Sequence, residues 1–137
     1  MSKSSQPPPL SDAQLAIMNI VWDRREATVG QVWRTISAER AVARNTVLAL
    51  ITRLEEKGWL SHRTEGNAFF YRATVPRKTT LRRMVRRLVD TAFEGSAEGL
   101  VLALLESRDL SAEEAARIRT MLGQARPSAK AKKGHKS

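Results

Sequence analysis

The sequence contains no cysteine, only two histidines, and aromatic residues at 5% of its 137 positions. Without cysteine the protein can form neither a disulfide nor a thiolate metal site, and this composition is typical of a reducing compartment. No run approaches the ~20 apolar residues that cross a bilayer, and the opening stretch MSKSSQPPPLSDAQ has no apolar segment of the secretory type. We therefore expect a cytoplasmic protein.

The two histidines give little support to catalysis. His62 lies beside an expected hairpin and His135 lies in a lysine-rich stretch. No cysteine, paired carboxylates or glycine-rich phosphate loop accompanies either one. We predict that the protein is not an enzyme, and we assign no catalytic residue, metal ligand or cofactor.

Positive charge is abundant. Lysine and arginine number 24 against 14 acidic residues, which gives a formal net charge of +10 and a pI of about 11.0. The resulting field attracts polyanions over roughly a Debye length, ~8–10 Å at ordinary salt. Nucleic acid is therefore the leading partner class, with an anionic membrane surface as another.

The chain divides into four stretches by composition and periodicity. Residues 1–9, with a triple proline, predict a disordered lead-in, and residues 126–137, rich in lysine, predict a basic disordered tail. Between them we expect a DNA-binding domain over residues 10–76 and a helical module over residues 77–125.

Two capping-box patterns predict where the first two helices begin. Ser11 with Gln14 predicts a helix at about 11–23, and Thr28 with Gln31 predicts one that ends near Glu39. The apolar face of the first helix is expected to consist of Leu15, Met18 and Trp22.

The stretch ARNTVLALITRLEEKGWL, residues 43–60, predicts a third helix that ends at Gly58. Val47, Leu50, Ile51 and Leu54 recur at helical spacing and make one apolar stripe. The opposite side and the helix start carry side chains that are polar or small and never acidic: Arg44, Asn45, Thr46, Ala49, Thr52 and Arg53.

A hairpin is expected directly after this helix. WLSHR and AFFYRAT are rich in aromatic and β-branched residues, and the turn cluster TEGN at 64–67 separates them. On the hairpin, Arg63, Thr64 and Asn67 are candidates for contact with phosphates or a minor groove, although Glu65 does not suit that task.

This order predicts a mainly α fold with a small β-hairpin, namely a winged helix-turn-helix followed by a helical dimerisation module. In such a module the third helix enters the major groove of double-stranded DNA. Arginine can bind a guanine edge, asparagine an adenine edge, and threonine a thymine methyl or a phosphate. The alternative is that the outer face of this helix meets only water.

After Pro76 the helical period returns. One face of the next helix is apolar, and four arginines lie on its other side: Arg82, Arg83, Arg86 and Arg87. Ser96 is expected to cap the apolar segment 100–105, and Ser111 with Glu114 predicts a capping box for a last helix. These helices are too short to close a core alone.

Burial against a second copy of the chain is the expected solution, and folding back onto the winged helix is the alternative. The candidate dimerisation residues are Leu81, Met84, Val85, Leu88, Phe93, Leu100, Val101, Leu104, Ile118, Met121 and Leu122.

The runs LSDAQLAIMNIVWDRREATVGQVW, NTVLALITRLEEKGWLSHRTEGNAFFYRATV and FEGSAEGLVLALLESRDLSAEEAARIRTML closely resemble the penicillinase-repressor (BlaI/MecI) family. The resemblance covers about residues 10–123. It implies a bacterial, nucleoid-associated, homodimeric transcriptional repressor that binds a palindromic operator. Thr46, Thr52 and Arg53 match positions that meet DNA in that family.

The resemblance also implies an inducing signal. In the family, a membrane-bound sensor protease detects a β-lactam, and the repressor is cut at an Asn-Phe bond in its dimerisation region. None of Asn19, Asn45 and Asn67 precedes phenylalanine here, and the cysteine ligands of the copper-responsive branch are absent. The sequence therefore leaves the inducer open.

Two other functions compete with an operator-binding repressor. A non-specific DNA-coating protein could use the arginine-rich segment near residues 77–87 and the lysine tail for phosphate attraction. Direct membrane binding is not expected, because the apolar residues of that segment are needed for a core and no Trp or Phe anchor accompanies them before Phe93.

Overall fold

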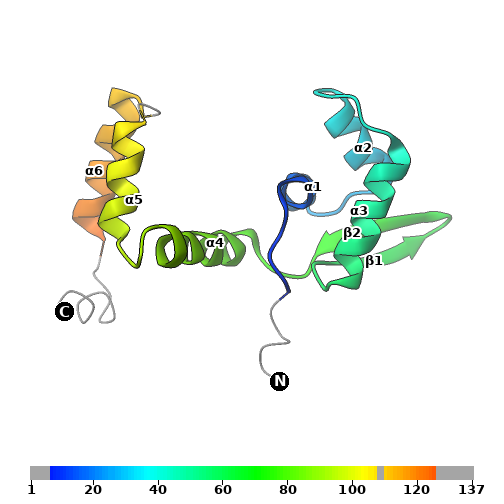
Figure 1. Cartoon of the computed structure of the whole chain (residues 1–137). Helices are drawn as coiled ribbons and strands as arrows, with labels where there is room; N and C mark the ends of the chain where they lie inside the picture. The colour runs from blue at the N-terminus through cyan, green and yellow to red at the C-terminus, as the bar shows by residue number, and fades with distance from the viewer. Residues whose placement is uncertain (1–6, 108–109, 126–137) are drawn as a thin grey trace, which may run out of the picture. The chain divides into compact units, whose positions relative to one another are not determined.

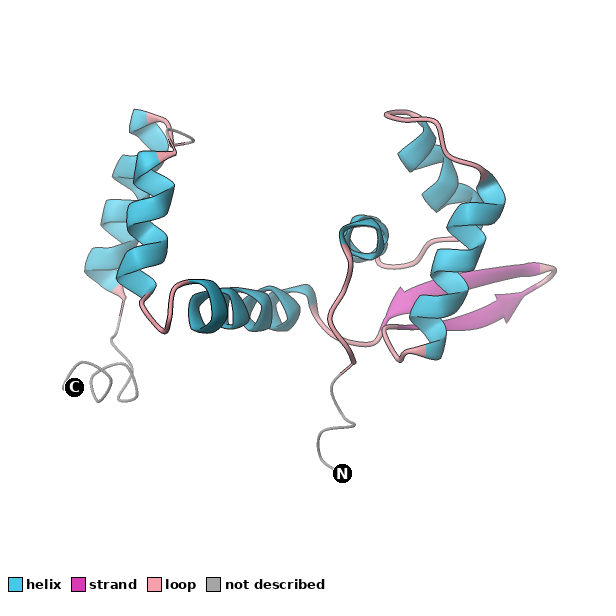
Figure 2. Cartoon of the chain, in the orientation of Figure 1, coloured by secondary structure: helices cyan, strands magenta, loops and turns pink. Residues whose placement is uncertain are grey.

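The computed structural model describes residues 7–107 and 110–125. Within this part of the chain, three helices are followed by a two-stranded antiparallel hairpin and three more helices (Figure 1). The elements are α1 Asp12–Arg24, α2 Val29–Ser37, α3 Arg44–Glu56, β1 Leu60–Glu65, β2 Ala68–Ala73, α4 Arg77–Ala92, α5 Ala97–Glu106 and α6 Ala112–Gln124. Figure 2 shows the small share of strand against helix, which confirms the predicted fold class. The expected tail and the first six residues of the lead-in lie outside the described residues.

The chain forms two units, Met1–Met84 and Val85–Ser137. The point of division between these units lies within α4. The first turns of α4 join the N-terminal unit because Thr80 is buried there and the Nε of Arg77 donates to Oδ1 of Asn19 in α1 at 3.3 Å.

Side-chain caps fix where the helices begin. Ser11 accepts from the backbone N–H of Gln14 at 3.1 Å, and the Gln14 side chain accepts from the Ser11 N–H at 2.9 Å. Thr28 and Gln31 form the same reciprocal pair at the start of α2. Both predicted capping boxes are thus confirmed, because each satisfies two backbone donors that a helix start leaves unpaired.

The C-terminal helices are capped more simply. The hydroxyl of Ser96 accepts from the N–H of Gly99, and the hydroxyl of Ser111 accepts from the N–H of Glu114 at 3.0 Å. For α6, the reciprocal bond of a capping box is not among the hydrogen bonds of the described residues, so only half of the predicted box forms.

The core of the N-terminal unit collects side chains from α1, α2, α3 and the hairpin. Its buried residues are Ile17, Met18, Val21, Ala27, Val32, Val47, Ile51, Leu54, Trp59, Leu60 and Tyr71. In α1, Met18 lies in the core as expected, and half-buried Trp22 packs against that core. Ile17 and Val21, which were not expected on this face, are fully buried, whereas Leu15 is only half-buried. Shortening a fully buried residue such as Ile51 to alanine typically costs ~2–5 kcal/mol of stability.

Two tryptophans tie segments far apart in the sequence. The indole N–H of Trp22 in α1 donates to the carbonyl oxygen of Val75 at 2.9 Å, which anchors the chain just before α4. The indole of Trp59 donates at 2.9 Å to the carbonyl of Pro8. The last residues of the expected lead-in are therefore attached to the domain, since a proline carbonyl supplies the acceptor that a buried indole N–H requires.

In the C-terminal unit, large apolar side chains stay exposed. None of the described residues of α5 and α6 is buried. The exposed set in this unit is Val85, Leu88, Val101, Leu102, Leu104, Leu105, Met121 and Leu122, and Met84, the last residue of the N-terminal unit, is exposed as well. Exposed apolar surface on this scale indicates an interaction surface.

Candidate nucleic-acid interface

One face of α3 is anchored in the core and the other is free. Val47, Ile51 and Leu54 are completely buried. The six residues singled out on the opposite side are all exposed: Arg44, Asn45, Thr46, Ala49, Thr52 and Arg53. The buried stripe thus holds α3 in place while polar and basic side chains point outward.

The start of α3 is held by the third tryptophan. The indole of Trp33 in α2 donates to the carbonyl oxygen of Val42 at 2.9 Å. Val42 precedes the cap residue Ala43, which offers no side-chain acceptor to the helix start. The first turn of α3 also contains no acidic residue, so the positive end of the helix dipole favours an anion such as a DNA phosphate there.

A turn at Gly58 connects α3 to the hairpin. Gly58 has φ of +91°, its N–H donates to the Glu55 carbonyl, and the N–H of Trp59 donates to the Leu54 carbonyl at 2.9 Å. These two bonds are the Schellman pattern that ends a helix at a residue of positive φ. The predicted C-cap role of Gly58 is confirmed.

The hairpin turn is shorter than the sequence suggested. Glu65 pairs with Ala68, so the turn consists of Gly66 and Asn67 alone, with φ of +62° at Gly66. Thr64, expected in the turn, belongs to β1 and pairs with Phe69. Strand pairing continues to the turn because a two-residue loop with glycine first matches the twist of the strands. Thr64 and Asn67 are both exposed near the tip.

Arg63 is already engaged by carboxylates. Its Nε and Nη2 donate to the two carboxylate oxygens of Glu26 at 2.8 and 2.9 Å, and its Nη1 donates to Glu65 at 2.6 Å. The hydrogen bonds that Arg63 donates to Glu26 and Glu65 raise the pKa of Arg63, and the bond to Glu26 lowers the pKa of Glu26. The predicted phosphate contact of Arg63 therefore competes with these carboxylates for its N–H donors.

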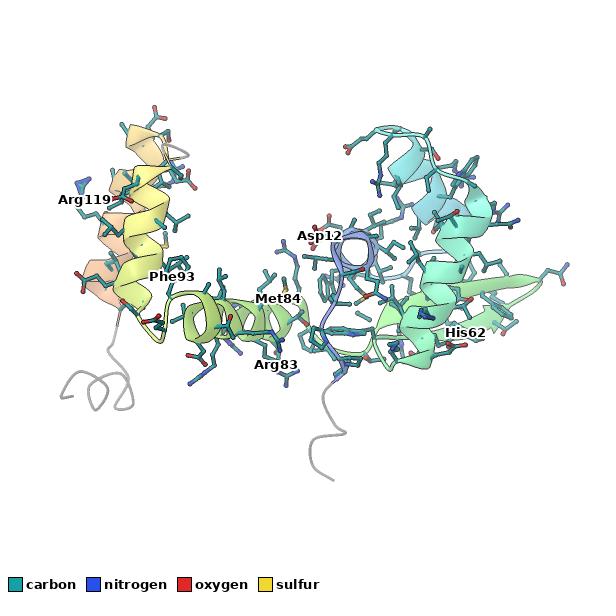
Figure 3. All side chains as sticks on the ribbon, viewed as in Figure 1. Asp12, His62, Arg83, Met84, Phe93 and Arg119 are labelled. Carbon is teal, nitrogen blue, oxygen red and sulfur yellow. The ribbon has the colours of Figure 1, made fainter. Side chains whose placement is uncertain are left out.

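His62 faces α3. Its Nδ1 lies 2.7 Å from Oε2 of Glu55, and its ring stacks on Phe69 with centroids 4.2 Å apart. Figure 3 shows His62 on the hairpin beside α3. Tyr71 is buried on the same face of the hairpin, and this burial, followed by the charge of Glu55, raises its pKa. Phe69 stays 47% exposed, so the two aromatic residues are not buried alike. This group fixes the hairpin against the last turns of α3.

Glu26, Leu48 and Glu55 contribute to this surface but were not predicted as site residues. Glu26 in the α1–α2 connection and Glu55 in α3 bind side chains of the hairpin, and no local pattern in the sequence indicates these distant partners. Leu48, 43% exposed, lies among the polar side chains of α3. The only local signal for it was its position outside the buried stripe.

The expected dimerisation residues differ in exposure. Leu81, Phe93, Leu100 and Ile118 are half-buried, and the others are exposed, from 39% at Met84 to 63% at Leu122. Figure 3 shows the side chains of Met84 and Arg83 on different sides of α4. Leu102 and Leu105, which the sequence reasoning left out, are exposed as well.

Other kinds of site find little support in the described residues. Within residues 7–107 and 110–125, no group of three His, Asp or Glu side chains could hold a metal ion. No helix in the described part of the chain is long and apolar enough to span a membrane.

Three helices, a two-stranded wing and an outward polar face on α3 define a winged-helix DNA-binding protein. The model of the penicillinase repressor family matches residues 10–124, and the chain therefore belongs to that family. The family consists of transcriptional repressors, which confirms that the protein is not an enzyme.

Known relatives match over most of their length. The methicillin resistance regulatory protein MecI of Mammaliicoccus sciuri is 27% identical over 115 residues, which cover 84% of this chain and 94% of that protein. The penicillinase repressor of Bacillus licheniformis is 27% identical over 107 residues, covering 78% and 84%. Among solved structures, wild-type MarR from E. coli in its apo form has a TM-score of 0.51 at 17% identity, covering 84% of this chain and 76% of that one. This last similarity concerns the fold alone.

Proposed function

We propose that this protein is a dimeric transcriptional repressor that binds a palindromic operator, with α3 of each protomer in a major groove. The observation that carries the proposal is the division of α3 into a fully buried stripe and an exposed polar face without acidic residues at its start. A helix held in this way presents its outer side chains at fixed positions to a groove.

Within α3, we assign base readout to Arg44 and Asn45. Arginine can donate two hydrogen bonds to guanine, and asparagine can bind adenine through two hydrogen bonds. Both residues are exposed in the first turn, the part of a recognition helix that contacts base edges. Thr46, Ala49, Thr52 and Arg53 complete the proposed contact surface.

The hairpin adds backbone contacts in this proposal. Thr64 and Asn67 are exposed at its tip, where a wing meets phosphates beside the groove. Such contacts set the position of the protein on DNA and contribute affinity without sequence information.

Dimerisation is proposed through the exposed apolar residues of the C-terminal unit. A second copy of the chain would bury Leu88, Val101 and Leu104, which are 43–44% exposed in the single chain. A closed dimer has a twofold axis, and a twofold protein matches a palindrome with half-sites a whole number of helical turns apart.

Relief of repression by an upstream sensor is also part of the proposal. The family resemblance makes a membrane sensor protease the proposed partner. Since the sequence contains no Asn-Phe dipeptide, any such cleavage would use another bond. The lifetime of the protein in cells with and without a β-lactam tests a relay triggered by that signal, because such a relay shortens the lifetime and an unchanged lifetime speaks against it.

A non-specific DNA-coating protein is a second candidate. It is favoured by the exposed arginines on one side of α4, which are Arg82, Arg83, Arg86 and Arg87. Such a protein gains its affinity from phosphate neutralisation alone, so its binding is independent of sequence and falls steeply with salt.

Selection of DNA fragments by the purified protein separates the two functions. At about 0.15 M salt non-specific contacts are already weakened. Enrichment of an inverted repeat with half-sites about one helical turn or a multiple apart supports a dimeric repressor. Recovery without a shared motif supports the coating protein.

A further inference from the structure

Three of the five N–H donors of the Arg63 guanidinium, one on each nitrogen, are bound by acidic partners. Glu26 takes Nε and Nη2, and Glu65 takes Nη1. The guanidinium carbon also lies 4.7 Å from the centre of the Phe70 ring, so the side chain is laid across the hairpin. The group therefore combines one positive and two negative charges on the surface proposed to meet DNA.

The position of Glu26 is fixed by its backbone. Ala27 forms an antiparallel bridge to Tyr71, with hydrogen bonds of 2.9 and 2.8 Å in the two directions. On its other side, Arg25 ends α1 at φ of +74°, a conformation that L residues rarely adopt. The connection between α1 and α2 thus holds the Glu26 carboxylate at the edge of β2, where Arg63 reaches it from β1.

Glu26 and Glu65 place negative charge on the surface that is proposed to bind DNA, itself a polyanion. In a chain of net charge +10, basic side chains on a wing should be available to phosphates. Here the relative exposure of the side chains is 49% for Arg63, 32% for Glu26 and 66% for Glu65, so water and solutes reach all three. Ion pairs as exposed as these are weak and exchange readily.

Building on the operator-binding role proposed above, we propose that Glu26 and Glu65 compete with DNA phosphate for Arg63 and thereby reduce the affinity of the protein for DNA. In free protein Arg63 is paired with the carboxylates. On DNA its guanidinium exchanges onto a phosphate oxygen, and the cost of breaking its bonds to the two carboxylates reduces the affinity. Because phosphates carry no sequence information, the penalty applies to every DNA and reduces non-specific binding as much as operator binding.

The competition predicts a gain of affinity when a carboxylate is neutralised. Glu26→Gln and Glu65→Gln should each tighten binding about two- to fivefold, the range expected for exposed ion pairs. A random-sequence duplex at low salt is the first probe, since it does not require the operator to be known. The duplex recovered by selection is the second, and the same factor is expected on both.

Measuring the effect of Glu26→Gln in a protein that also carries Arg63→Gln tests whether the gain depends on Arg63. If the carboxylates act by holding Arg63, Glu26→Gln gives no gain in a protein that already carries Arg63→Gln. Glu39→Gln is the matched control, because Glu39 is exposed, has no ion pair among the described residues and loses the same charge. Thermal unfolding of each variant verifies that it is folded.

The outcomes separate three accounts. A gain for Glu26→Gln that exceeds that of Glu39→Gln and vanishes with Arg63→Gln supports the competition. An equal gain for both variants that persists without Arg63 overturns it in favour of long-range charge. Unchanged or weaker binding of Glu26→Gln overturns it in favour of a structural brace between the hairpin and the α1–α2 connection. In these cases the wild-type protein still binds DNA, whereas a wild type that binds no DNA refutes the operator-binding role itself.

Discussion

The indole N–H of Trp33 donates to the carbonyl oxygen of Val42 at 2.9 Å, immediately before the residue that caps α3. This bond joins α2 to the turn from which the proposed recognition helix starts. The position of Arg44 and Asn45 relative to the core therefore depends on a contact made by a different helix.

Replacing Trp33 by phenylalanine tests whether the turn before α3 positions this helix for DNA binding. The change keeps most of the apolar surface but leaves the Val42 carbonyl without its donor, and we expect a loss of about 0.5–1.5 kcal/mol in the free energy of unfolding. Trp22→Phe, which removes the bond to Val75, is the matched control. We expect a similar loss of stability from both, measured by urea unfolding, but a larger loss of DNA affinity from Trp33→Phe. Equal affinities would show that the turn does not position α3.

Alanine at Arg44 or Asn45 tests base readout. Each replacement should weaken binding to the selected operator by about 1–3 kcal/mol and leave binding to random DNA nearly unchanged. Arg40→Ala is a suitable control, since Arg40 is exposed and precedes α3. Equal losses on operator and random DNA would move Arg44 and Asn45 from base readout to phosphate contact.

A charged residue in the apolar set of the C-terminal unit tests dimerisation. Leu104→Lys should convert the dimer to a monomer in sedimentation experiments, because burying an unpaired ammonium is costly. Thr91→Lys adds the same charge at an exposed polar position of α4 and should leave the mass unchanged. A monomeric wild type would favour the alternative in which this segment folds onto its own winged helix.

Removal of residues 126–137 tests whether the lysine-rich tail contributes to binding. If the tail binds phosphates, the truncated protein binds all DNA more weakly, and the slope of log affinity against log salt falls by about 0.9 for each phosphate that the tail had neutralised. Titrations at several salt concentrations measure this slope. An unchanged slope would exclude a phosphate role for the tail.

The pH dependence of stability tests the pairing of Glu26 with Arg63. Because Arg63 holds the pKa of Glu26 below its usual value of 4.5, the folded state binds this proton less tightly than the unfolded chain does. The stabilisation is therefore present above pH 4.5 and is lost as the pH falls through the lowered pKa. Wild-type protein should lose more stability than Glu26→Gln between about pH 7 and pH 3 in urea unfolding. Parallel pH profiles would contradict this pairing in solution.

Local patterns predicted the helices and the wing well. Ser11 and Thr28 cap α1 and α2 as expected, because a capping box is encoded within four residues. Gly58 ends α3 as expected, since its positive φ suits glycine. The inner face of α1 was predicted only in part. Met18 and Trp22 pack in or against the core as expected, but Ile17 and Val21 are buried as well, and Leu15 is only half-buried.

Contacts between distant segments could not be read from the sequence. The bonds of Trp22 to Val75 and of Arg63 to Glu26 join residues 53 and 37 positions apart. Periodicity indicates which face of an element is apolar, but it does not identify the partner of a polar group on another element. For this reason Arg63 was expected to be free for DNA, while its neutralisation by carboxylates became visible only in the folded chain.

The most direct test of the central claim is a parallel selection of operators from random DNA by the wild-type protein and by the Asn45→Ala variant. If α3 of two protomers reads a palindrome, the wild type enriches an inverted repeat, and the variant loses preference at one base position in each half-site, symmetrically about the centre. An identical motif for both proteins would contradict readout by Asn45, and no motif for the wild type would contradict an operator-specific repressor.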